Sequence, residues 1–210
     1  MADENAVPPP AATTVRGDYP VDIAVDYPPE MNRFLPLVKW LLLIPHYVAL
    51  IVLAVVGIVL LVASFFAVLF TGRYPKGMHD FMVGLNRWGL RVSAYMFLLT
   101  DKYPAFTLEE QPEDTVKIRL DYPPEGRIAR WRPLVQWILS IPYAIAAGVL
   151  INLGYVLAFI AVFTILFTKK FPRGMWDITV ETLRWQTRSY AYQLWLVDKY
   201  PPFRWEASSE

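Results

Sequence analysis

The chain contains no cysteine and only two histidines, His46 and His79, among its 210 residues. The absence of cysteine excludes disulfides, thiolate nucleophiles, iron–sulfur clusters and cysteine-based structural zinc. Two histidines are too few for a histidine-rich metal centre. We therefore expect neither a metal nor a cofactor, and the redox compartment stays undetermined.

Enzyme signatures are also missing. The sequence has no Walker or dinucleotide glycine pattern, no Gly-x-Ser-x-Gly and no His-Glu-x-x-His. We expect a protein that is not an enzyme. The formal net charge of +1 favours neither a nucleic acid nor an acidic partner.

Long apolar runs are abundant. Hydrophobic residues make up 55% of the chain, above the roughly 45–50% of soluble proteins. No charged residue occurs from Trp40 to Gly72 or from Leu134 to Thr168. Both runs exceed the roughly 20 apolar residues that a helix needs to cross a bilayer. The 8 Trp and 12 Tyr suit membrane–water interfaces. The sequence therefore predicts an α-helical integral membrane protein.

Each run admits two structures. Pro45 and Pro142 lie early in the runs and should kink or break a helix. Gly57 and Gly154 lie near the middle, where a tight helical hairpin could turn. The alternative, which we favour, is a long helix with a close helix–helix contact at these glycines.

The chain is an internal duplication. Matching segments are 36–40 with 133–137, 69–71 with 166–168, 101–104 with 198–201 and, with a two-residue slip, 26–30 with 121–125. We predict one pseudo-symmetric membrane repeat over 20–110 and another over 111–210. Residues 1–19, polar and proline-rich, are expected to form a disordered tail without an export signal.

Short strands are expected at both ends of each repeat. Alternation at Val21, Ile23 and Val25, and likewise from Val116 to Leu120, predicts opening strands. Similar alternation at Phe106–Leu108 and Phe203–Trp205 predicts closing strands. Together they should form a small extramembrane sheet of about four strands.

Each long run is followed by an amphipathic helix with a charged stripe. The stripe residues are Asp80, Arg87 and Arg91 in the first repeat and Asp177, Glu181, Arg184 and Arg188 in the second. Charges in lipid cost kilocalories. The helix therefore lies in the interface, which we favour, or crosses the membrane with its stripe facing protein.

Two passages per repeat would place all strands on one side of the membrane. We assign this side and both termini to the cytoplasm, giving a multi-pass protein of the cell membrane. A single passage per repeat would put the similar basic loops on opposite sides.

Several of these residues are candidates for binding. The stripe could bind lipid phosphates or a partner's charges, or it could be a solvated face with Glu181–Arg184 and Glu181–Arg188 pairs. The loop bases could bind anionic lipid or only anchor the topology; these are Arg73, Lys76, Lys169, Lys170 and Arg173. His46 could bind a ligand or proton, although a histidine at a helix start near the headgroups is the preferred interpretation.

The motifs resemble a known bacterial family. Ile-Pro-His-Tyr at 44–47, the loop 69–77, the helix around Arg87-Trp88 and Asp-Lys-Tyr-Pro at 101–104 are similar to domain of unknown function 4389. Tandem copies resemble actinobacterial members. Tyr143 stands at the position of His46, and Lys169 at that of Gly72. The resemblance implies a membrane location and no particular activity.

We expect a non-enzymatic accessory or scaffolding subunit of a larger membrane assembly. Its partners would be membrane lipids and another membrane protein, with no nucleic acid. The alternative is a lipid- or small-solute-handling protein that uses Arg87, Arg91, Arg184 and Arg188 on a face between the repeats.

Overall fold

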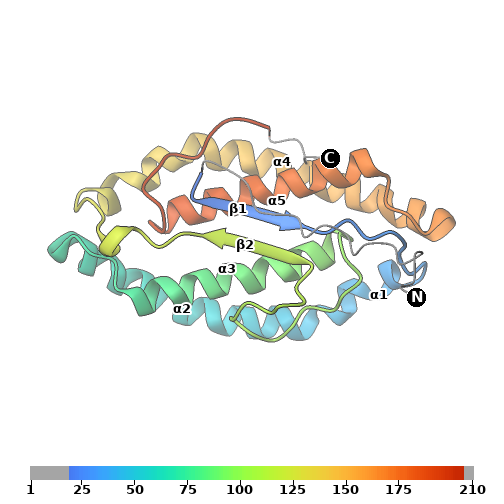
Figure 1. The fold of residues 1–210 in the computed structure, drawn as a ribbon, viewed down its shortest axis with the longest axis horizontal. Coiled ribbons are helices and arrows are strands. Elements are labelled where there is room, and N and C mark those ends of the chain that lie inside the picture. Colours follow the sequence, from blue (N-terminus) through green and yellow to red (C-terminus); the bar gives the residue numbers. More distant parts are fainter. Residues whose placement is uncertain (1–18, 206–210) are drawn as a thin grey trace, which may run out of the picture.

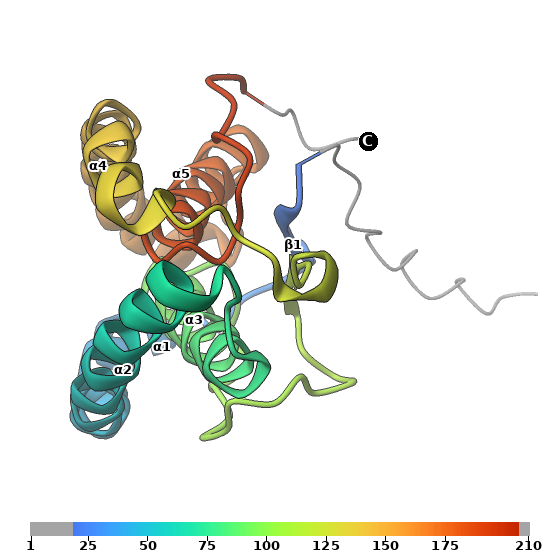
Figure 2. The same cartoon turned by 90° about the vertical axis from the view of Figure 1, so that its left-hand side faces the viewer.

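Three layers make up the computed structural model, which describes residues 19–205 (Figures 1 and 2). The tail predicted for 1–19 lies outside the described residues except for Tyr19. One layer contains the long apolar helices, the next the two amphipathic helices and the third a sheet. The elements are β1 (Val21–Val25), α1 (Leu35–Leu42), α2 (Ile44–Thr71), α3 (Lys76–Met96), β2 (Val116–Leu120), the 3-10 turn η1 (Pro124–Gly126), α4 (Arg132–Thr168) and α5 (Arg173–Gln193).

The sheet consists of two antiparallel strands, with Ile23 opposite Ile118. The two opening strands are thereby confirmed. The predicted closing strands were wrong, because 106–108 and 203–205 are irregular. In the first repeat, arginine side chains take backbone carbonyls that a strand would otherwise use, as described below. The sheet therefore has two strands in place of the four expected.

The two repeats exchange their strands. β1 opens the first repeat but packs on α5 of the second, whereas β2 opens the second repeat and packs on α3 of the first (Figure 1). Because β1 and β2 are antiparallel, a pseudo-twofold axis passes through the sheet. Each strand buries the amphipathic helix of the other repeat, so the duplicated units depend on one another.

The long apolar runs form helices without a hairpin turn. The first run breaks at Leu43, between α1 and α2, next to Pro45, while α4 continues through Pro142. A Cβ atom added at Gly57 would lie 3.2 Å from the Leu85 side chain, and one at Gly154 would lie 2.8 Å from Thr182 Oγ1. The glycines thus permit close approach of α2 to α3 and of α4 to α5, as the favoured alternative predicted.

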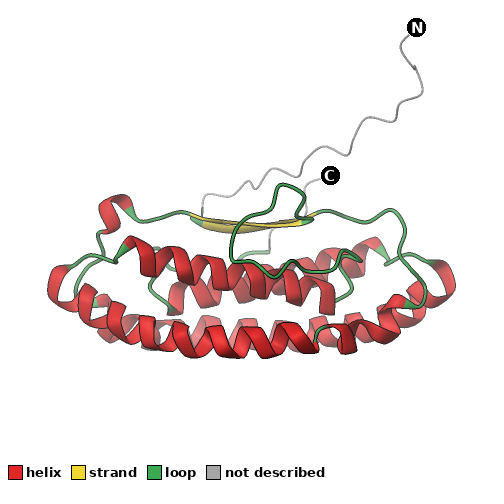
Figure 3. Ribbon diagram, turned by 90° about the horizontal axis from the view of Figure 1, so that it is seen from below, coloured by secondary structure: helices red, strands yellow, loops and turns green. Residues whose placement is uncertain are grey.

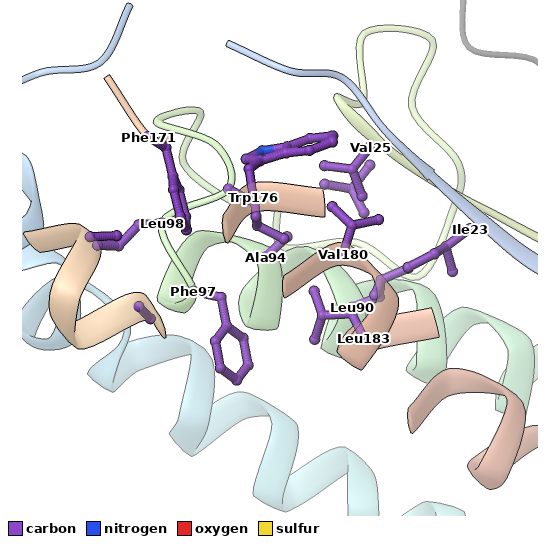
Figure 4. Packing of buried hydrophobic residues seen from close by; sticks show 14 of the residues in the cluster. Ile23, Val25, Leu90, Ala94, Phe97, Leu98, Phe171, Trp176, Val180 and Leu183 are labelled. Atoms are coloured by element: carbon purple, nitrogen blue, oxygen red, sulfur yellow. The ribbon is translucent and has the colours of Figure 1, made fainter. Parts of the chain in front are cut away.

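The main hydrophobic core lies between the sheet and the amphipathic helices (Figure 4). Ile23 of β1 meets Leu90 of α3 and Leu183 of α5 there. The apolar alternation of the strands is explained by this packing. The core also fixes the distance between the sheet and the charged stripe of each helix.

The outer surface of α1, α2 and α4 is apolar and exposed. Both helical segments, 35–71 and 132–168, are long and apolar enough by length and composition to cross a membrane. Only 11% and 22% of their most apolar windows are buried, unlike the core helix of a soluble protein. Figure 3 shows these helices as one layer on the side opposite the sheet, bowed so that their ends rise toward it.

Candidate functional site

The charged stripe of α5 is buried under β1. Arg184 Nε lies 2.7 Å from Asp22 Oδ1, and its guanidinium also pairs with Glu181 and donates to the Ile23 carbonyl at 3.2 Å. Arg188 is fully buried, donates to the Val21 carbonyl at 3.1 Å and lies 3.6 Å from Asp22. The arginines of this stripe therefore face protein, so a solvated face does not describe them.

The arginines of the α3 stripe pack against residues 105–114, a segment between α3 and β2 that is called the linker below. Arg91 donates to the carbonyls of Ala105, Thr107 and Glu109. Its Nε lies 3.2 Å from Asp114, which is also buried. Burial lowers the pKa of Arg91, and the Asp114 carboxylate opposes that shift. Arg91 therefore holds the linker against α3.

Arg87 extends the same contact toward solvent. It donates to the Leu108 carbonyl at 3.0 Å and lies 3.9 Å from Glu110. Arg87 and Arg91 thus share the backbone of 105–109, whereas Arg184 and Arg188 share Asp22. Each arginine pair is bound to a different segment, and the contacts that hold them are internal.

The counter-charges of the two stripes differ between the repeats. Lys117 of β2 stands at the position of Asp22 in β1, so β2 cannot neutralise the arginines of α3. The acidic linker supplies Glu110 and Asp114 in its place. The linker is therefore part of the packing of the first repeat.

The remaining acidic candidates lie away from this buried network. Asp80 accepts a hydrogen bond from Lys76 at 2.6 Å, and both side chains are largely exposed. Asp177 pairs with Arg173 at 3.3 Å in the same one-turn spacing. Such exposed pairs contribute little to stability.

The loop bases occupy two opposite ends of the molecule. Arg73 forms a backbone bridge with Arg127 at one end. Lys169 accepts a backbone hydrogen bond from Met31 at the other, next to the exposed Lys170. The guanidinium of Arg173 lies over the ring of Trp176 at 5.0 Å. The structure therefore does not bring the two sets of bases together.

His46 is part of a buried aromatic cluster. It is fully buried and its Nδ1 accepts a hydrogen bond from Trp88 Nε1 at 3.0 Å, while its ring stacks on Phe106 at 3.8 Å. At the equivalent place Tyr143 stacks on Trp185 at 4.8 Å. Both positions hold the segment after the amphipathic helix, which explains why His and Tyr can replace one another.

Sequence reasoning missed a second pair of buried polar residues. Lys39 donates to the Thr100 carbonyl at 2.7 Å and pairs with Asp101 at 2.8 Å. Gln136, its repeat equivalent, donates to the Tyr192 and Val197 carbonyls. Both secure the turn that ends the amphipathic helix. Their equivalent positions in the repeat, among the apolar residues that open each long helical segment, were the signal that could have identified them.

A pocket of about 390 Å³ lies between α2, α3 and α5 near the pseudo-twofold axis. Polar side chains line it together with apolar ones; the polar ones are Asn86, Ser93, Gln186, Thr187 and Tyr190. A second pocket, of about 310 Å³, is lined by Arg91, Lys102 and Asp114 beside the linker. Among residues 19–205, no cluster of His, Asp or Glu could hold a metal ion.

Comparison with known proteins adds a family and no activity. No curated protein and no solved structure matches the chain. A family model described as "Domain of unknown function (DUF4389)" matches residues 36–107 and 130–204. One match lies within each of the two repeats, and together the matches cover more than half of the sequence. The chain therefore belongs to the DUF4389 family, as a member with two tandem copies of the domain.

Proposed function

We propose that the protein is a non-enzymatic accessory or scaffolding subunit of a larger bacterial membrane assembly. It is attached through the apolar layer of α1, α2 and α4 and presents its sheet to a partner. Tyr19 donates a hydrogen bond to the Lys199 carbonyl at 2.9 Å, so both ends of the described chain lie on the sheet side. We place this side in the cytoplasm at the cell membrane.

The observation that supports a partner is the outer edge of β2. In an antiparallel pair, every second residue of a strand directs its N–H and C=O groups toward the other strand. The backbone hydrogen bonds from Asp26 to Thr115 and from Asp121 to Pro20 show which residues these are. By this alternation, the backbone N–H and C=O groups of Val116, Ile118 and Leu120 point away from β1. None of them has a hydrogen-bond partner within residues 19–205.

The equivalent edge of β1 is closed by arginines. Carbonyls of Val21 and Ile23 accept hydrogen bonds from Arg188 and Arg184. The corresponding arginines of α3 hold the linker, which leaves β2 open. An open edge is a template for strand addition, and the half-exposed Lys117 and Arg119 favour a partner strand with acidic side chains.

Purification from native membranes in mild detergent or nanodiscs, followed by mass spectrometry, tests this function. A stoichiometric protein partner is expected. Ile118→Pro, which removes an outward N–H and blocks strand addition, should release that partner. Lys170→Gln at the far end of the molecule should retain it. Absence of a stoichiometric partner from the unmodified protein contradicts the proposal.

A second function, lipid or small-solute handling, is favoured by the pocket between α2, α3 and α5. Its polar side chains come from α3 and α5 and lie beside apolar side chains such as Ala54 of α2, a combination that suits an amphiphile. Gln186 Oε1 is buried there without a hydrogen-bond partner among the described residues. The arginines would act only indirectly, since β1 and the linker hold them.

Lipid that co-purifies with the protein tests this second function. Replacing Gln186 with Leu should remove a tightly held amphiphile without loss of folding, whereas Asn152→Leu on exposed α4 should not. Arg87→Gln and Arg184→Gln should lower the free energy of unfolding more than they lower the amount of co-purified lipid. Unchanged lipid content in the Gln186 variant would exclude the pocket as the binding site.

A further inference from the structure

The geometry points to a protein that lies in one leaflet of an anionic bilayer without crossing it. The outer face of α1, α2 and α4 would insert among the acyl chains, parallel to the membrane plane. The basic ends would rest on the headgroups and the sheet would face water. This replaces the two passages per repeat that the sequence suggested, and it holds whether or not a protein partner binds the sheet.

Helix length is the first argument. The segment 132–168 is one unbroken helix of 37 residues, which at about 1.5 Å per residue extends roughly 55 Å. The hydrocarbon core is about 30 Å thick. Spanning it with the whole segment would need a tilt well beyond the roughly 40° at which transmembrane helices are seen. A helix that lies in the plane has no such limit.

The position of the sheet is the second argument. The strands run alongside the long helices, over their middle (Figures 1 and 3). If the helices crossed the bilayer, Lys117, Arg119 and Asp121 would lie near its centre, each at a cost of about 3 kcal/mol or more. The acidic part of the linker, residues 109–114, would lie there too. An in-plane orientation leaves all of these groups in water.

The charge distribution is the third argument. α2 and α4 are antiparallel, so their basic loops lie at opposite ends of the molecule (Figure 1). Exposed bases gather at each end; they include Arg73, Lys76, Arg127 and Arg130 at one and Arg33, Lys169, Lys170 and Arg173 at the other. A crossing would divide them between the two sides, against the positive-inside rule. An in-plane protein brings both ends to the same anionic headgroup layer.

The curvature of the long helices agrees with this orientation. Their ends rise toward the sheet, so the middle of the apolar face projects farthest (Figure 3). The middle of the face has Val55 and Val149, both more than half exposed. Amphipathic helices in an interface insert about 5–10 Å. The apolar middle would therefore reach the acyl chains while the basic ends stay among the headgroups.

Cysteine labelling in bacterial membranes tests the orientation, because the full chain has no cysteine of its own. Lys76→Cys and Lys170→Cys report on the two ends, and Lys117→Cys reports on the sheet. A membrane-impermeant maleimide, applied to spheroplasts and to inverted vesicles, should label all three from the same side. Val55→Cys, the matched control within the apolar face, should react from neither side.

Two other outcomes would overturn the proposal. Labelling of Lys76→Cys and Lys170→Cys from opposite sides would show that α2 and α4 cross the membrane. Labelling of both ends from one side and of Lys117→Cys from the other would restore two passages per repeat. Each variant is first shown to fold by its elution as the same species as the unmodified protein in detergent.

Lipid preference tests the headgroup contact separately. In vesicles of phosphatidylcholine with brominated phosphatidylglycerol, quenching of the native tryptophans should exceed that given by brominated phosphatidylcholine. The variant Lys169→Gln with Lys170→Gln should reduce this excess, with Lys117→Gln as the unaffected control. Equal quenching by the two lipids would contradict the anionic contact.

Discussion

Asp22 of the first repeat and Arg184 of the second form a buried ion pair, with 2.7 Å between Oδ1 and Nε. They are 162 positions apart in the chain. The same carboxylate lies 3.6 Å from Arg188, so one acid of β1 contacts two arginines of α5, and Glu181 supplies a second carboxylate to Arg184. This contact links β1 of the first repeat to α5 of the second.

Removing the carboxylate should therefore destabilise the protein strongly. We expect Asp22→Asn to lower the free energy of unfolding by about 3 kcal/mol, because buried arginines lose their partner. Asp80→Asn, which breaks only the exposed pair with Lys76, should cost less than about 1 kcal/mol. Denaturant unfolding in detergent compares the two, and equal losses would contradict the role of Asp22.

The linker contact should depend on the shape of arginine as well as on its charge. Arg91 binds three carbonyls and the Asp114 carboxylate at once, which a lysine ammonium cannot reproduce. We expect Arg91→Lys to be at least as destabilising as Asp114→Asn. A double-mutant cycle between the two should give a coupling of about 1–3 kcal/mol. Additive effects would show that the linker is not held in this way.

Backbone strain at the end of α4 should be removable. Lys169 has φ 59°, the left-handed conformation that Gly72 adopts at φ 69° at the end of α2. Lys169→Gly should stabilise the protein by about 1 kcal/mol, and Gly72→Ala should destabilise it by a similar amount. Thermal unfolding of the two variants measures this, and shifts of the same sign would refute it.

Helix packing at Gly154 should be sensitive to a single methyl group. An added Cβ would lie 2.8 Å from Thr182 Oγ1, whereas one at Gly148 meets nothing within 4 Å. Gly154→Ala should destabilise the protein by about 1–3 kcal/mol. Gly148→Ala in the same helix should be neutral or stabilising by up to about 1 kcal/mol. Equal changes in the stability of the two variants would contradict the close packing at Gly154.

Acid should weaken the fold through His79. Burial lowers its pKa, and the neighbouring Asp80 opposes the shift only in part. The unfolded chain, with a histidine pKa of about 6.5, then binds the proton more readily than the folded chain. The contribution of neutral His79 to the stability of the fold is therefore complete above a pH of about 6.5 and is lost as the pH falls below it. Stability measured at pH 7.5 and at pH 5.5 should differ less in His79→Gln than in the unmodified protein.

The sequence allowed the duplication, both opening strands and the amphipathic helices to be predicted, because their periodicity reflects local packing. It did not allow the strand exchange to be predicted. That arrangement depends on Asp22 reaching a helix of the other repeat, and on Asp114 serving where Lys117 replaces an acid. The alternation at 106–108 also indicated a strand, but Arg87 and Arg91 bind the backbone of that segment. Such side-chain contacts leave no mark in local patterning.

The depth of two residues at the middle of the molecule tests the in-plane orientation most directly. Nitroxides attached at Val55, on the apolar face, and at Lys117, on the sheet, are compared in bilayers for collision with oxygen and with a nickel chelate. The in-plane account predicts that Val55 encounters oxygen and that Lys117 encounters nickel. If both were exposed to oxygen and shielded from nickel, the helices would cross the membrane and the account would be wrong.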